Sequence, residues 1–314
     1  MRAFTITSKI DPMNVFAIVN PISGAGATRD ASTARAALLR ERFRAANVEG
    51  EVHVTERCGH ASELADQALG RGVHTVLAWG GDGTINEVAS VLAGTDAALG
   101  IVPSGSGNGF ARALQLPRTP AAAIDGALLG VERLIDVGVL NGRLFFNIAG
   151  IGLDARIAER FNACEQGKRG MGPYVRIGLR EAFRYRPDPM DIDLDGERVV
   201  SRALLVAFAN GGEYGNRACI APHARVDDGR LEAVVVDDRA PIARLWGSRH
   251  LLLRQPERAP GMTFRSIQHA EVRAAGALPF HVDGEHGVAQ GVITVRIRPG
   301  YLRVRVPAEG GVFQ

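Results

Sequence analysis

Hydrophobic and polar positions in the first half of the chain alternate between short apolar runs and longer segments with helical spacing. The runs at 15–19, 75–79 and 99–102 are almost wholly apolar, which is typical of buried strands. Residues 31–46 place apolar side chains on one face and predict an amphipathic helix. Alternation of this kind indicates a doubly wound α/β domain, which we expect to span residues 1–140. Its other predicted elements are strands at 52–55 and 133–139 and helices at 61–69, 86–93 and 120–129.

The pattern changes near residue 143, where strand-like segments replace the alternation with helices. These segments lie at 190–194, 199–210, 231–236, 270–273, 280–282 and 291–297. Asp-Gly pairs at 195–196, 228–229 and 283–284 mark turns between them. The pattern predicts a second, mostly β domain over residues 141–298, organised as a sandwich. A last strand is predicted at 301–306, and residues 299–314 are expected to return to the first domain.

Composition agrees with a soluble protein. The chain has 314 residues, of which 46% are hydrophobic and 23% charged. We find no run near the roughly 18 apolar residues of a membrane span, and the first residues lack the pattern of a secretory signal. Cys58, Cys164 and Cys219 lie far apart, so we expect reduced thiols in a cytoplasmic protein. The net charge of +3 permits binding to an anionic surface.

One helix-prone segment, at 156–186, mixes basic with apolar side chains. Its basic residues are Arg156, Arg160, Lys168, Arg169, Arg176, Arg180, Arg184 and Arg186. A segment of this kind can lie on an anionic bilayer, which predicts transient, peripheral contact with the inner face of the membrane. A solvated helix face packed on a sheet is an equally good interpretation. A second apolar and basic run at 245–254 slightly favours the membrane.

Glycine-rich loops follow three of the predicted strands, at 20–24, 80–83 and 103–109. Glycines let the backbone approach a ligand closely, and the N–H groups at a helix start favour an anion such as phosphate. Asp82 lies between two of these glycines, and a carboxylate beside phosphates indicates a bridging cation, most often Mg²⁺. A tight turn with a solvated aspartate would explain one such loop. Three loops at one sheet edge favour a nucleotide or polyphosphate site.

Six motifs occur along the chain in a fixed order. They are NPISG (20–24), GGDGTINE (80–87), PSGSGN (103–108), IDVG (135–138), DDGRLE (227–232) and DGE (283–285). Together they resemble the diacylglycerol kinase catalytic family, which includes soluble bacterial lipid kinases and sphingosine kinases. GGDGT alone is only moderately specific, since NAD kinases carry a similar motif and phosphofructokinases a related one. The resemblance covers nearly the whole chain.

The resemblance implies an ATP-dependent kinase that phosphorylates a lipid hydroxyl, with diacylglycerol as the expected acceptor. Asp283 matches the general base, and Glu285 would support it. By the same resemblance, ATP would be contacted by Asn20, Pro21, Ile22, Ser23, Gly24, Thr55, Gly81, Asp82, Gly83, Thr84, Ile85, Asn86, Glu87 and Ser106. Since Asp283 lies in the β region and the loops lie in the α/β region, we expect the reaction to occur between the domains. Taken alone, an Asp-Gly pair is more often a hairpin turn.

The resemblance also implies two Mg²⁺ sites. Asp82 and Asp136 match acidic residues of a network of aspartates, water and Mg²⁺ at the phosphates. The turn around Asp228 resembles a second, structural site, which the backbone carbonyls of Arg225 and Arg230 would complete. Without the resemblance, Asp136 would be read as a turn or cap residue.

Residue 109 departs from the family pattern. Many bacterial diacylglycerol kinases have an aspartate after the asparagine of the third loop, whereas this chain has Gly109. Sphingosine kinases also lack that carboxylate. The mode of Mg²⁺ binding and the acceptor, diacylglycerol or a sphingoid base, therefore stay open.

Two other functions are considered beside a lipid kinase. The first is a soluble-substrate kinase of the NAD kinase type, which the β domain and the apolar and basic segments disfavour. The second is a non-catalytic nucleotide- or lipid-binding regulator, which the presence of Asp82, Asp283 and Glu285 disfavours. Among partners we expect a lipid substrate and no nucleic acid, and a homodimer stays open.

Overall fold

The computed structural model describes residues 14–24, 29–163, 180–181, 184–214, 218–240, 249–251 and 253–308. Most of the predicted basic segment at 156–186, and residues 245–248 and 252 of the second basic run, lie outside the described residues. The described part of the first segment includes helix α6 (Leu153–Ala163). Among the described helices, none combines the length and hydrophobicity that a membrane span requires.

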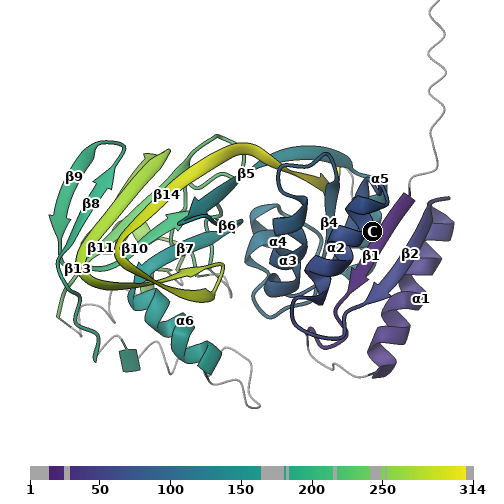
Figure 1. The fold of residues 1–314 in the computed structure, drawn as a ribbon, viewed down its shortest axis with the longest axis horizontal. Helices are drawn as coiled ribbons and strands as arrows, with labels where there is room; N and C mark the ends of the chain where they lie inside the picture. The colour runs from purple at the N-terminus through teal and green to yellow at the C-terminus, as the bar shows by residue number, and fades with distance from the viewer. Residues whose placement is uncertain are drawn as a thin grey trace, which may run out of the picture.

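The first half of the chain forms parallel strands joined by helices, on the right of Figure 1. The strands β1 (Asn14–Val19), β2 (Glu49–Val54), β3 (Thr75–Gly80) and β4 (Ala98–Pro103) lie in the order β2-β1-β3-β4. The helices are α1 (Arg29–Ala45), α2 (His60–Gly70), α3 (Asp82–Leu92), α4 (Gly109–Ala113) and α5 (Pro120–Leu129). Each of these strand pairs is parallel, so the carboxyl ends of the strands share one edge of the sheet.

Helices cover both faces of this parallel sheet. Leu39 of α1 and Ile124 of α5 pack in one buried cluster with side chains of β1, β3 and β4. Ala65 of α2 and Ile85 of α3 pack in a second cluster on the opposite side chains of the same strands. Burial on both faces explains why these strands read as continuous apolar runs. The prediction of a doubly wound α/β domain is confirmed.

The second half is dominated by antiparallel strands, on the left of Figure 1. They are β5 (Val131–Leu140), β6 (Arg143–Phe145), β7 (Ile148–Gly152), β8 (Met190–Leu194), β9 (Glu197–Ser201), β10 (Ala203–Ala209), β11 (Leu231–Asp237), β12 (Met262–Ile267), β13 (His269–Val282) and β14 (Glu285–Val306). Their inward side chains, including Phe145, Phe208 and Ile293, form one core. The predicted sandwich-like β domain is therefore present. A 3₁₀ turn, Pro256–Arg258, precedes β12.

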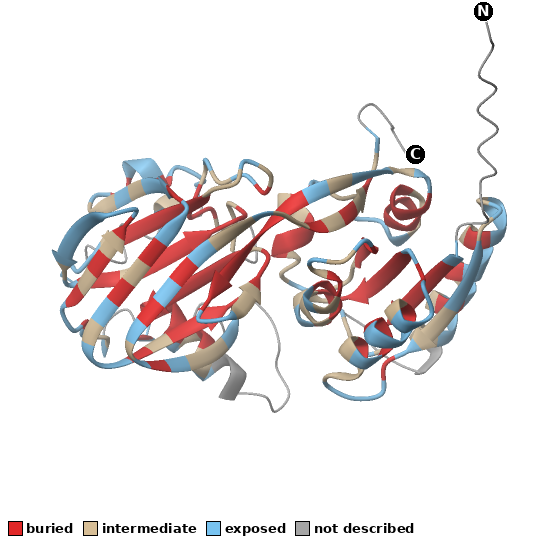
Figure 2. Ribbon diagram, turned by 45° about the horizontal axis from the view of Figure 1, so that its top comes forward, coloured by how far each residue is buried: buried red, intermediate tan, exposed pale blue. Residues whose placement is uncertain are grey.

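Strand β14 belongs to both halves of the molecule. It is 22 residues long and pairs antiparallel with β13 and β5. Near its end it pairs in parallel with β4, where Arg303 lies opposite Ala98 and Val304 opposite Leu99. The described strands thereby form one continuous sheet, and buried residues run through both halves (Figure 2).

Several predicted strand boundaries in the β half were wrong. The segments 291–297 and 301–306 form one strand, because β14 stays paired with β5 on both sides of an irregularity between Arg298 and Leu302. The segments 270–273 and 280–282 likewise belong to β13, which has an irregularity between Arg273 and Ala277. Conversely, 199–210 divides into β9 and β10. The two strands are separate because β9 pairs with β8, whereas β10 pairs with β7 and β11.

Arg305 of β14 holds the carboxyl end of α5. Its guanidinium donates to the carbonyl oxygens of Ala127 (2.9 Å), Leu128 (2.9 Å) and Gly130 (3.0 Å). The side chain is only 10% exposed and also pairs with Glu132. A cation at a helix carboxyl end satisfies unpaired carbonyls and opposes the negative end of the helix dipole.

We expect Arg305→Ala to lower the free energy of unfolding by about 2–3 kcal/mol, because several hydrogen bonds from a charged group are lost together. Urea denaturation followed by circular dichroism measures this change. The control is Arg303→Ala, since Arg303 pairs with Asp96, whose side chain is 95% exposed. That variant is expected to lose less than about 1 kcal/mol. Equal losses in both variants would contradict the role of Arg305.

Candidate active site between the two domains

Three glycine-rich loops meet at the carboxyl edge of the parallel sheet. The second and third loops touch through glycines: a Cβ on Gly105 would lie 2.9 Å from the Cα of Gly81. The first loop reaches the third at Gly24, where a Cβ would lie 2.5 Å from the carbonyl oxygen of Ser104. Gly24 also has φ +88°, a conformation that L side chains rarely adopt. The glycines thus allow three backbone segments to approach one another.

Side chains fix the first loop against the other two. The Asn20 amide donates to Thr84 Oγ1 (2.8 Å), and the hydroxyls of Ser23 and Ser104 lie 2.7 Å apart. Arg35 of α1 donates to the carbonyl oxygens of Asn20 (2.5 Å) and Ser23 (2.6 Å). Partial burial lowers the pKa of Arg35. Sequence reasoning missed Arg35, because an arginine on an amphipathic helix gives no signal that it points at a loop.

Helix α3 begins at Asp82, four residues before the predicted start. Gly81 precedes it in an extended conformation (φ −86°, ψ −178°), so the chain passes from β3 into the helix at once. Gly83 therefore lies in the first helical turn and is exposed. N–H groups in the first turn have no partner within the helix, and the helix dipole makes this end attractive to an anion.

Asp82 joins the second loop to the third. Its carboxylate accepts hydrogen bonds from the backbone N–H of Asn108 (2.8 Å) and of Gly109 (2.9 Å). Burial raises the pKa of Asp82, and these two hydrogen bonds and the charge of Arg112 oppose the shift. Asn108 has φ +52°, and its side-chain amide makes two hydrogen bonds to the backbone of Gly105.

The predicted general base, Asp283, occupies the turn between β13 and β14. Asp283 and Gly284 have φ +48° and +90°, as a two-residue hairpin turn of the Asp-Gly type requires. The Asp283 carboxylate accepts backbone hydrogen bonds from Phe146 (2.8 Å), Asn147 (3.0 Å) and Ile148 (3.0 Å). The segment between β6 and β7 therefore wraps one side of this carboxylate.

Asn86 connects this carboxylate to the α/β domain. Its side-chain amide lies one helical turn after Asp82 and donates to Asp283 Oδ2 at 2.8 Å. Burial raises the pKa of Asp283, the three backbone hydrogen bonds oppose the shift, and the nearby charge of Asp82 adds to it. The structure thus brings the predicted phosphate loops and the predicted base together.

Some other predicted residues lie elsewhere. Glu285 is exposed, and its carboxylate pairs with the guanidinium of Arg143 (3.0 Å). Ile85 is 1% exposed and packs in the core under α3. Ile22 is 69% exposed at the tip of the first loop beside Pro21, and Ser106 is exposed in the third loop.

Glu87 and Thr55 hold neighbouring elements. The Glu87 carboxylate accepts the backbone N–H groups of Gly59 (3.2 Å) and Ala61 (3.1 Å), which lie at the start of α2. Thr55 is buried at the end of β2 and donates its N–H to the Val19 carbonyl. Glu87 thereby fixes α2 against α3.

Asp136 is placed with the Asp228 turn. Its carboxylate is buried and accepts the backbone N–H groups of Gly229 (2.6 Å) and Gly300 (2.8 Å). One hydrogen-bonded donor thus approaches each oxygen. These partners differ from those of Asp82, and the network of aspartates, water and Mg²⁺ that would join the two carboxylates stays a prediction.

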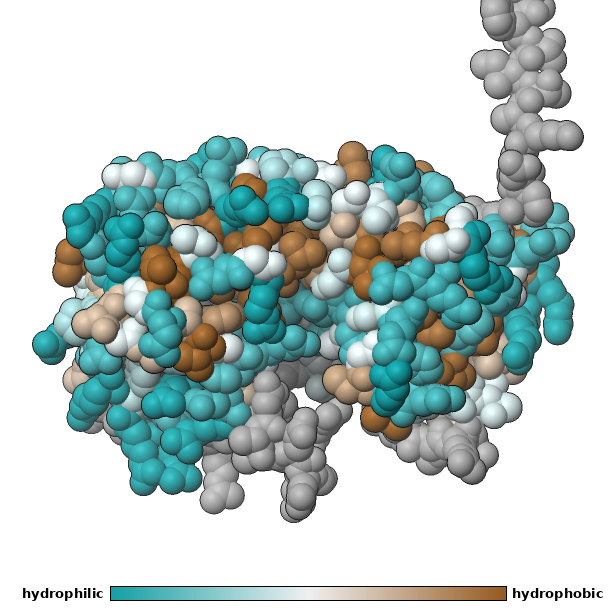
Figure 3. Space-filling model, in the orientation of Figure 1, coloured by the Kyte–Doolittle hydropathy of each residue, from teal (hydrophilic) through white to brown (hydrophobic). Residues whose placement is uncertain are grey.

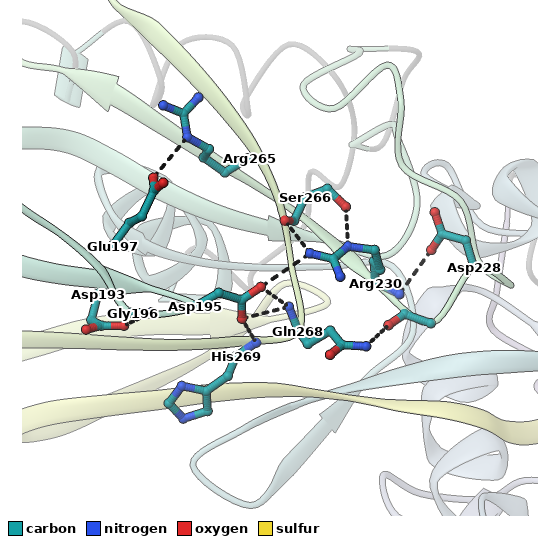
Figure 4. Close-up of polar contacts among 11 residues, drawn as sticks. Asp193, Asp195, Gly196, Glu197, Asp228, Arg230, Arg265, Ser266, Gln268 and His269 are labelled. Atoms are coloured by element: carbon teal, nitrogen blue, oxygen red, sulfur yellow. Dashed lines mark hydrogen bonds and ion pairs between the residues drawn. The ribbon is translucent and has the colours of Figure 1, made fainter.

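The Asp228 turn is tethered to neighbouring strands, as Figure 4 shows. The Arg230 N–H donates to Asp228 Oδ1 (3.0 Å), while the Arg230 guanidinium donates to Ser266 and pairs with Asp195. Asp195 in turn accepts the backbone N–H of His269 (2.8 Å). Arg225 pairs with Asp227 beside the turn. Within the described part of the chain, no three acidic, histidine or cysteine side chains gather around a common metal position.

Asp82 fits a phosphate-bound Mg²⁺ better than Asp136 does. Mg²⁺ in nucleotide sites is held by one or two carboxylates, substrate phosphates and water. Both aspartates accept one backbone hydrogen bond on each oxygen, but Asp82 is half-buried, whereas Asp136 is 3% exposed, so Asp82 is the more accessible to a hydrated ion. The carboxylate also lies at the end of the helix that faces the loops.

Comparison with known proteins gives two family-model matches that cover most of the chain. Residues 14–140 match the diacylglycerol kinase catalytic domain, and residues 147–306 match the YegS C-terminal NAD kinase beta sandwich-like domain. A crystal structure of a diacylglycerol kinase from Bacillus anthracis str. Sterne shares the fold. It superposes with a TM-score of 0.72 at 20% identity and covers 94% of this chain and 97% of that chain.

Two curated relatives are more similar in sequence. A protein named probable lipid kinase YegS-like, from Chromohalobacter salexigens, is 35% identical over 78% of this chain and 80% of its own length. A diacylglycerol kinase from Mycobacterium tuberculosis is 36% identical over 74% of this chain and 76% of its own length. The chain therefore belongs to the family of YegS-like and diacylglycerol kinase-like lipid kinases, and it is a kinase.

Proposed function

We propose that this kinase transfers the γ-phosphoryl group of ATP to the hydroxyl of a neutral lipid, diacylglycerol being the expected acceptor, with Asp283 as general base. The observation that carries the proposal is the hydrogen bond between Asn86 and Asp283. It brings a half-buried carboxylate of the β domain to the helix that follows the second glycine-rich loop. A base beside a phosphate cradle is the arrangement that phosphoryl transfer to an alcohol requires.

The three loops would bind the phosphates of ATP. The start of α3 offers main-chain N–H groups and the positive end of the helix dipole, and the close packing of Gly81 on Gly105 leaves the backbone uncovered by side chains. Asp82 would hold Mg²⁺ through water, and the ion would neutralise charge on the phosphates. The second Mg²⁺ site, at Asp228 with the carbonyls of Arg225 and Arg230, stays a prediction.

Asp283 would take the proton of the lipid hydroxyl. As the hydroxyl oxygen bonds to the γ-phosphorus, the bond from that phosphorus to the β–γ bridging oxygen breaks and ADP leaves. The proton passes to the Asp283 carboxylate. A pKa raised by burial makes this carboxylate a stronger base than an ordinary aspartate.

The base must first lose one of its hydrogen bonds. A carboxylate offers about four acceptor positions, and Asp283 receives one bond from Asn86 and three from the backbone. Among these four donors only Asn86 is a side chain, and it lies on the opposite domain. We expect the substrate hydroxyl to displace the Asn86 amide from Oδ2 and to keep the three backbone bonds.

A lipid acceptor requires contact with a membrane surface. We propose transient, peripheral binding, supported by the basic composition of 156–186, much of which lies outside the described residues. On the face in Figure 3, hydrophobic residues form separate patches within a hydrophilic surface. The described surface on that face therefore favours reversible contact over deep insertion.

Packing explains why residue 109 is glycine. A Cβ at this position would overlap the side-chain amide of Asn147, which donates to the carbonyl oxygen of Glu213 (3.0 Å). The backbone N–H of Asn147 also binds Asp283. An aspartate at position 109 would therefore disturb a residue that holds the base. The same glycine keeps a sphingoid base as the second candidate acceptor, because the resembling sphingosine kinases lack this carboxylate too.

The acceptor assay is the first test of the proposal. Phosphate transfer from γ-labelled MgATP is measured in mixed micelles that contain diacylglycerol, sphingosine, ceramide, monoacylglycerol, phosphatidylglycerol or undecaprenol. We expect labelled diacylglycerol, and a loss of about 10²–10⁴-fold in Asp283→Asn, because general-base catalysis contributes that much. ATP binding should persist in this variant. Asp96→Asn is the control, since Asp96 is exposed and pairs with Arg303 near the end of β14 opposite to the Asp283 turn. Full activity in Asp283→Asn would refute the assignment of Asp283 as the general base.

Substitution of Asn86 should move the pH dependence of the reaction. The active form of Asp283 is deprotonated, so kcat/KM falls as the pH falls through its pKa. Asn86→Ala removes a donor to the carboxylate, and Asn86→Asp places a second negative charge beside it. Both changes raise the pKa of Asp283. Asn86 binds Asp283 in the free enzyme, whose pKa values appear in kcat/KM. In pH profiles of kcat/KM, the acidic limb should therefore lie lowest in the wild type, higher in Asn86→Ala and highest in Asn86→Asp. An acidic limb at the same pH in Asn86→Asp as in the wild type would contradict the hydrogen bond between Asn86 and Asp283.

Restoring the family carboxylate should not raise activity. We expect Gly109→Asp to lower the free energy of unfolding by about 1–3 kcal/mol, because the new Cβ overlaps the Asn147 amide. Denaturation of Gly109→Asp, Asn147→Ala and the double variant forms a double-mutant cycle. The coupling should exceed about 0.5 kcal/mol, since removing the amide relieves the overlap. Additive losses would show that Asn147 is not the obstacle.

A further inference from the structure

Two buried polar side chains, Asp154 and His281, form a cluster with the half-buried Tyr214 behind the Asp283 turn. Asp154, in the first turn of α6, accepts a hydrogen bond from the Tyr214 hydroxyl (2.9 Å) and contacts His281 Nε2 (3.2 Å) through the same oxygen, Oδ2. The side chains of His281 and Asp154 are 6% and 8% exposed. Buried polar groups of this kind cost free energy unless they are paired, so their geometry is strongly specified.

The sequence makes room for this cluster with a glycine. Gly150 of β7 lies opposite His281 of β13 in the sheet. A Cβ on Gly150 would overlap the Asp154 carboxylate and lie 2.9 Å from His281 Nε2. The carboxylate and the imidazole therefore meet directly over the β7 backbone.

The other nitrogen of His281 reaches the turn that carries the base. Gly284 donates its backbone N–H to His281 Nδ1 at 3.3 Å. Because Nδ1 accepts this bond, the proton of the neutral imidazole lies on Nε2, where it can be donated to Asp154. The second oxygen of Asp154 accepts the N–H of Ala155 (2.8 Å), which fixes the carboxylate in place. Asp154 thus selects the tautomer of His281 that can hold Gly284.

The cluster also connects to the third glycine-rich loop. Arg112 of α4 pairs with Glu213 (3.3 Å) and donates to the backbone oxygen of Tyr214 (3.3 Å). Helix α4 starts at Gly109, whose N–H binds Asp82. Contacts therefore run from the predicted phosphate loops, through Tyr214 and Asp154, to the turn at Gly284.

We propose that His281 is a positioning residue for Asp283, and that it holds the Asp283–Gly284 turn through the tautomer that Asp154 selects. The proposal rests on the proposed function in taking Asp283 as the base. Asp283 has φ +48°, a left-handed conformation that costs free energy for a residue with a side chain. The backbone N–H groups of Phe146, Asn147 and Ile148 hold the carboxylate from one side, and His281 holds the following peptide from the other.

Two substitutions of His281 distinguish the roles of its two ring nitrogens. Asparagine places an amide oxygen near the position of Nδ1 and keeps an acceptor for Gly284, whereas glutamine places its amide near Nε2 and keeps only the contact with Asp154. Asp154→Asn is a third probe, because its amide can donate to Nε2 and would move the histidine proton to Nδ1, against the Gly284 N–H.

We expect His281→Gln and Asp154→Asn to lower kcat for lipid phosphorylation by about 10–100-fold, because a small displacement of a catalytic group has effects of that order. The KM for ATP should change less than about 2-fold, since the phosphate loops are untouched, and His281→Asn should restore kcat to within about 3-fold of the wild type. Thermal unfolding of each variant confirms that it is folded. Equal kcat losses in His281→Asn and His281→Gln would overturn the proposal.

A second readout does not depend on activity. In the ¹⁵N-histidine-labelled full chain, nuclear magnetic resonance should show His281 with its proton on Nε2, assigned by the signal missing in His281→Gln. Amide hydrogen exchange at Gly284 should be faster in His281→Gln and Asp154→Asn than in the wild type and His281→Asn. A proton on Nδ1, or unchanged exchange, would overturn the positioning role. If Asp283→Asn keeps kinase activity, the proposed base fails, while these measurements still decide whether His281 holds the turn.

Discussion

The arrangement of this protein depends on buried and half-buried carboxylates that accept main-chain N–H groups from distant segments. Asp283 gathers three consecutive amides at 146–148. Asp82 binds the N–H groups of Asn108 and Gly109, and Asp136 binds those of Gly229 and Gly300. A loop that leaves its sheet has unpaired N–H groups, and burying them without partners is costly. Each carboxylate satisfies several such groups at once and thereby fixes two segments relative to one another.

Those structural bonds also shape the chemistry of the site. A carboxylate that accepts several hydrogen bonds is stabilised in its charged form, whereas burial favours the neutral form, and for Asp82 and Asp283 burial prevails. The same set of contacts therefore orients Asp283 and tunes its basicity. Asn86 differs from the other donors to Asp283, because it reaches across from the α/β domain and can leave without disturbing the β domain.

Much of the fold was predictable from the sequence because its signals are local. Apolar runs such as 75–79 and the amphipathic segment 31–46 indicated the α/β domain, and α5 was predicted with its observed ends. The strand errors arose at 298–300 and 274–279, which the prediction left between separate strands. In the structure these segments include irregularities inside β14 and β13, because pairing with neighbouring strands continues beyond them. Pairing partners are a non-local property that a single sequence does not reveal.

The site was predictable only in part, for a related reason. The motifs located Asp82 and Asp283 through the resemblance, but their partners depend on contacts between distant residues. Asn86 and Asp283 are 197 positions apart, and His281 and Asp154 are 127 apart. Arg35, Asn147 and His281 belong to no motif, and their residue types are common at surfaces and in cores. The continuous strand β14 connects the two domains that make these distant contacts. Because it is hydrogen-bonded in both domains, any change in the angle between them must bend or twist β14 or break part of its pairing. The irregularity at 298–302, which contains Gly300 at φ +58°, lies between its two runs of pairing with β5.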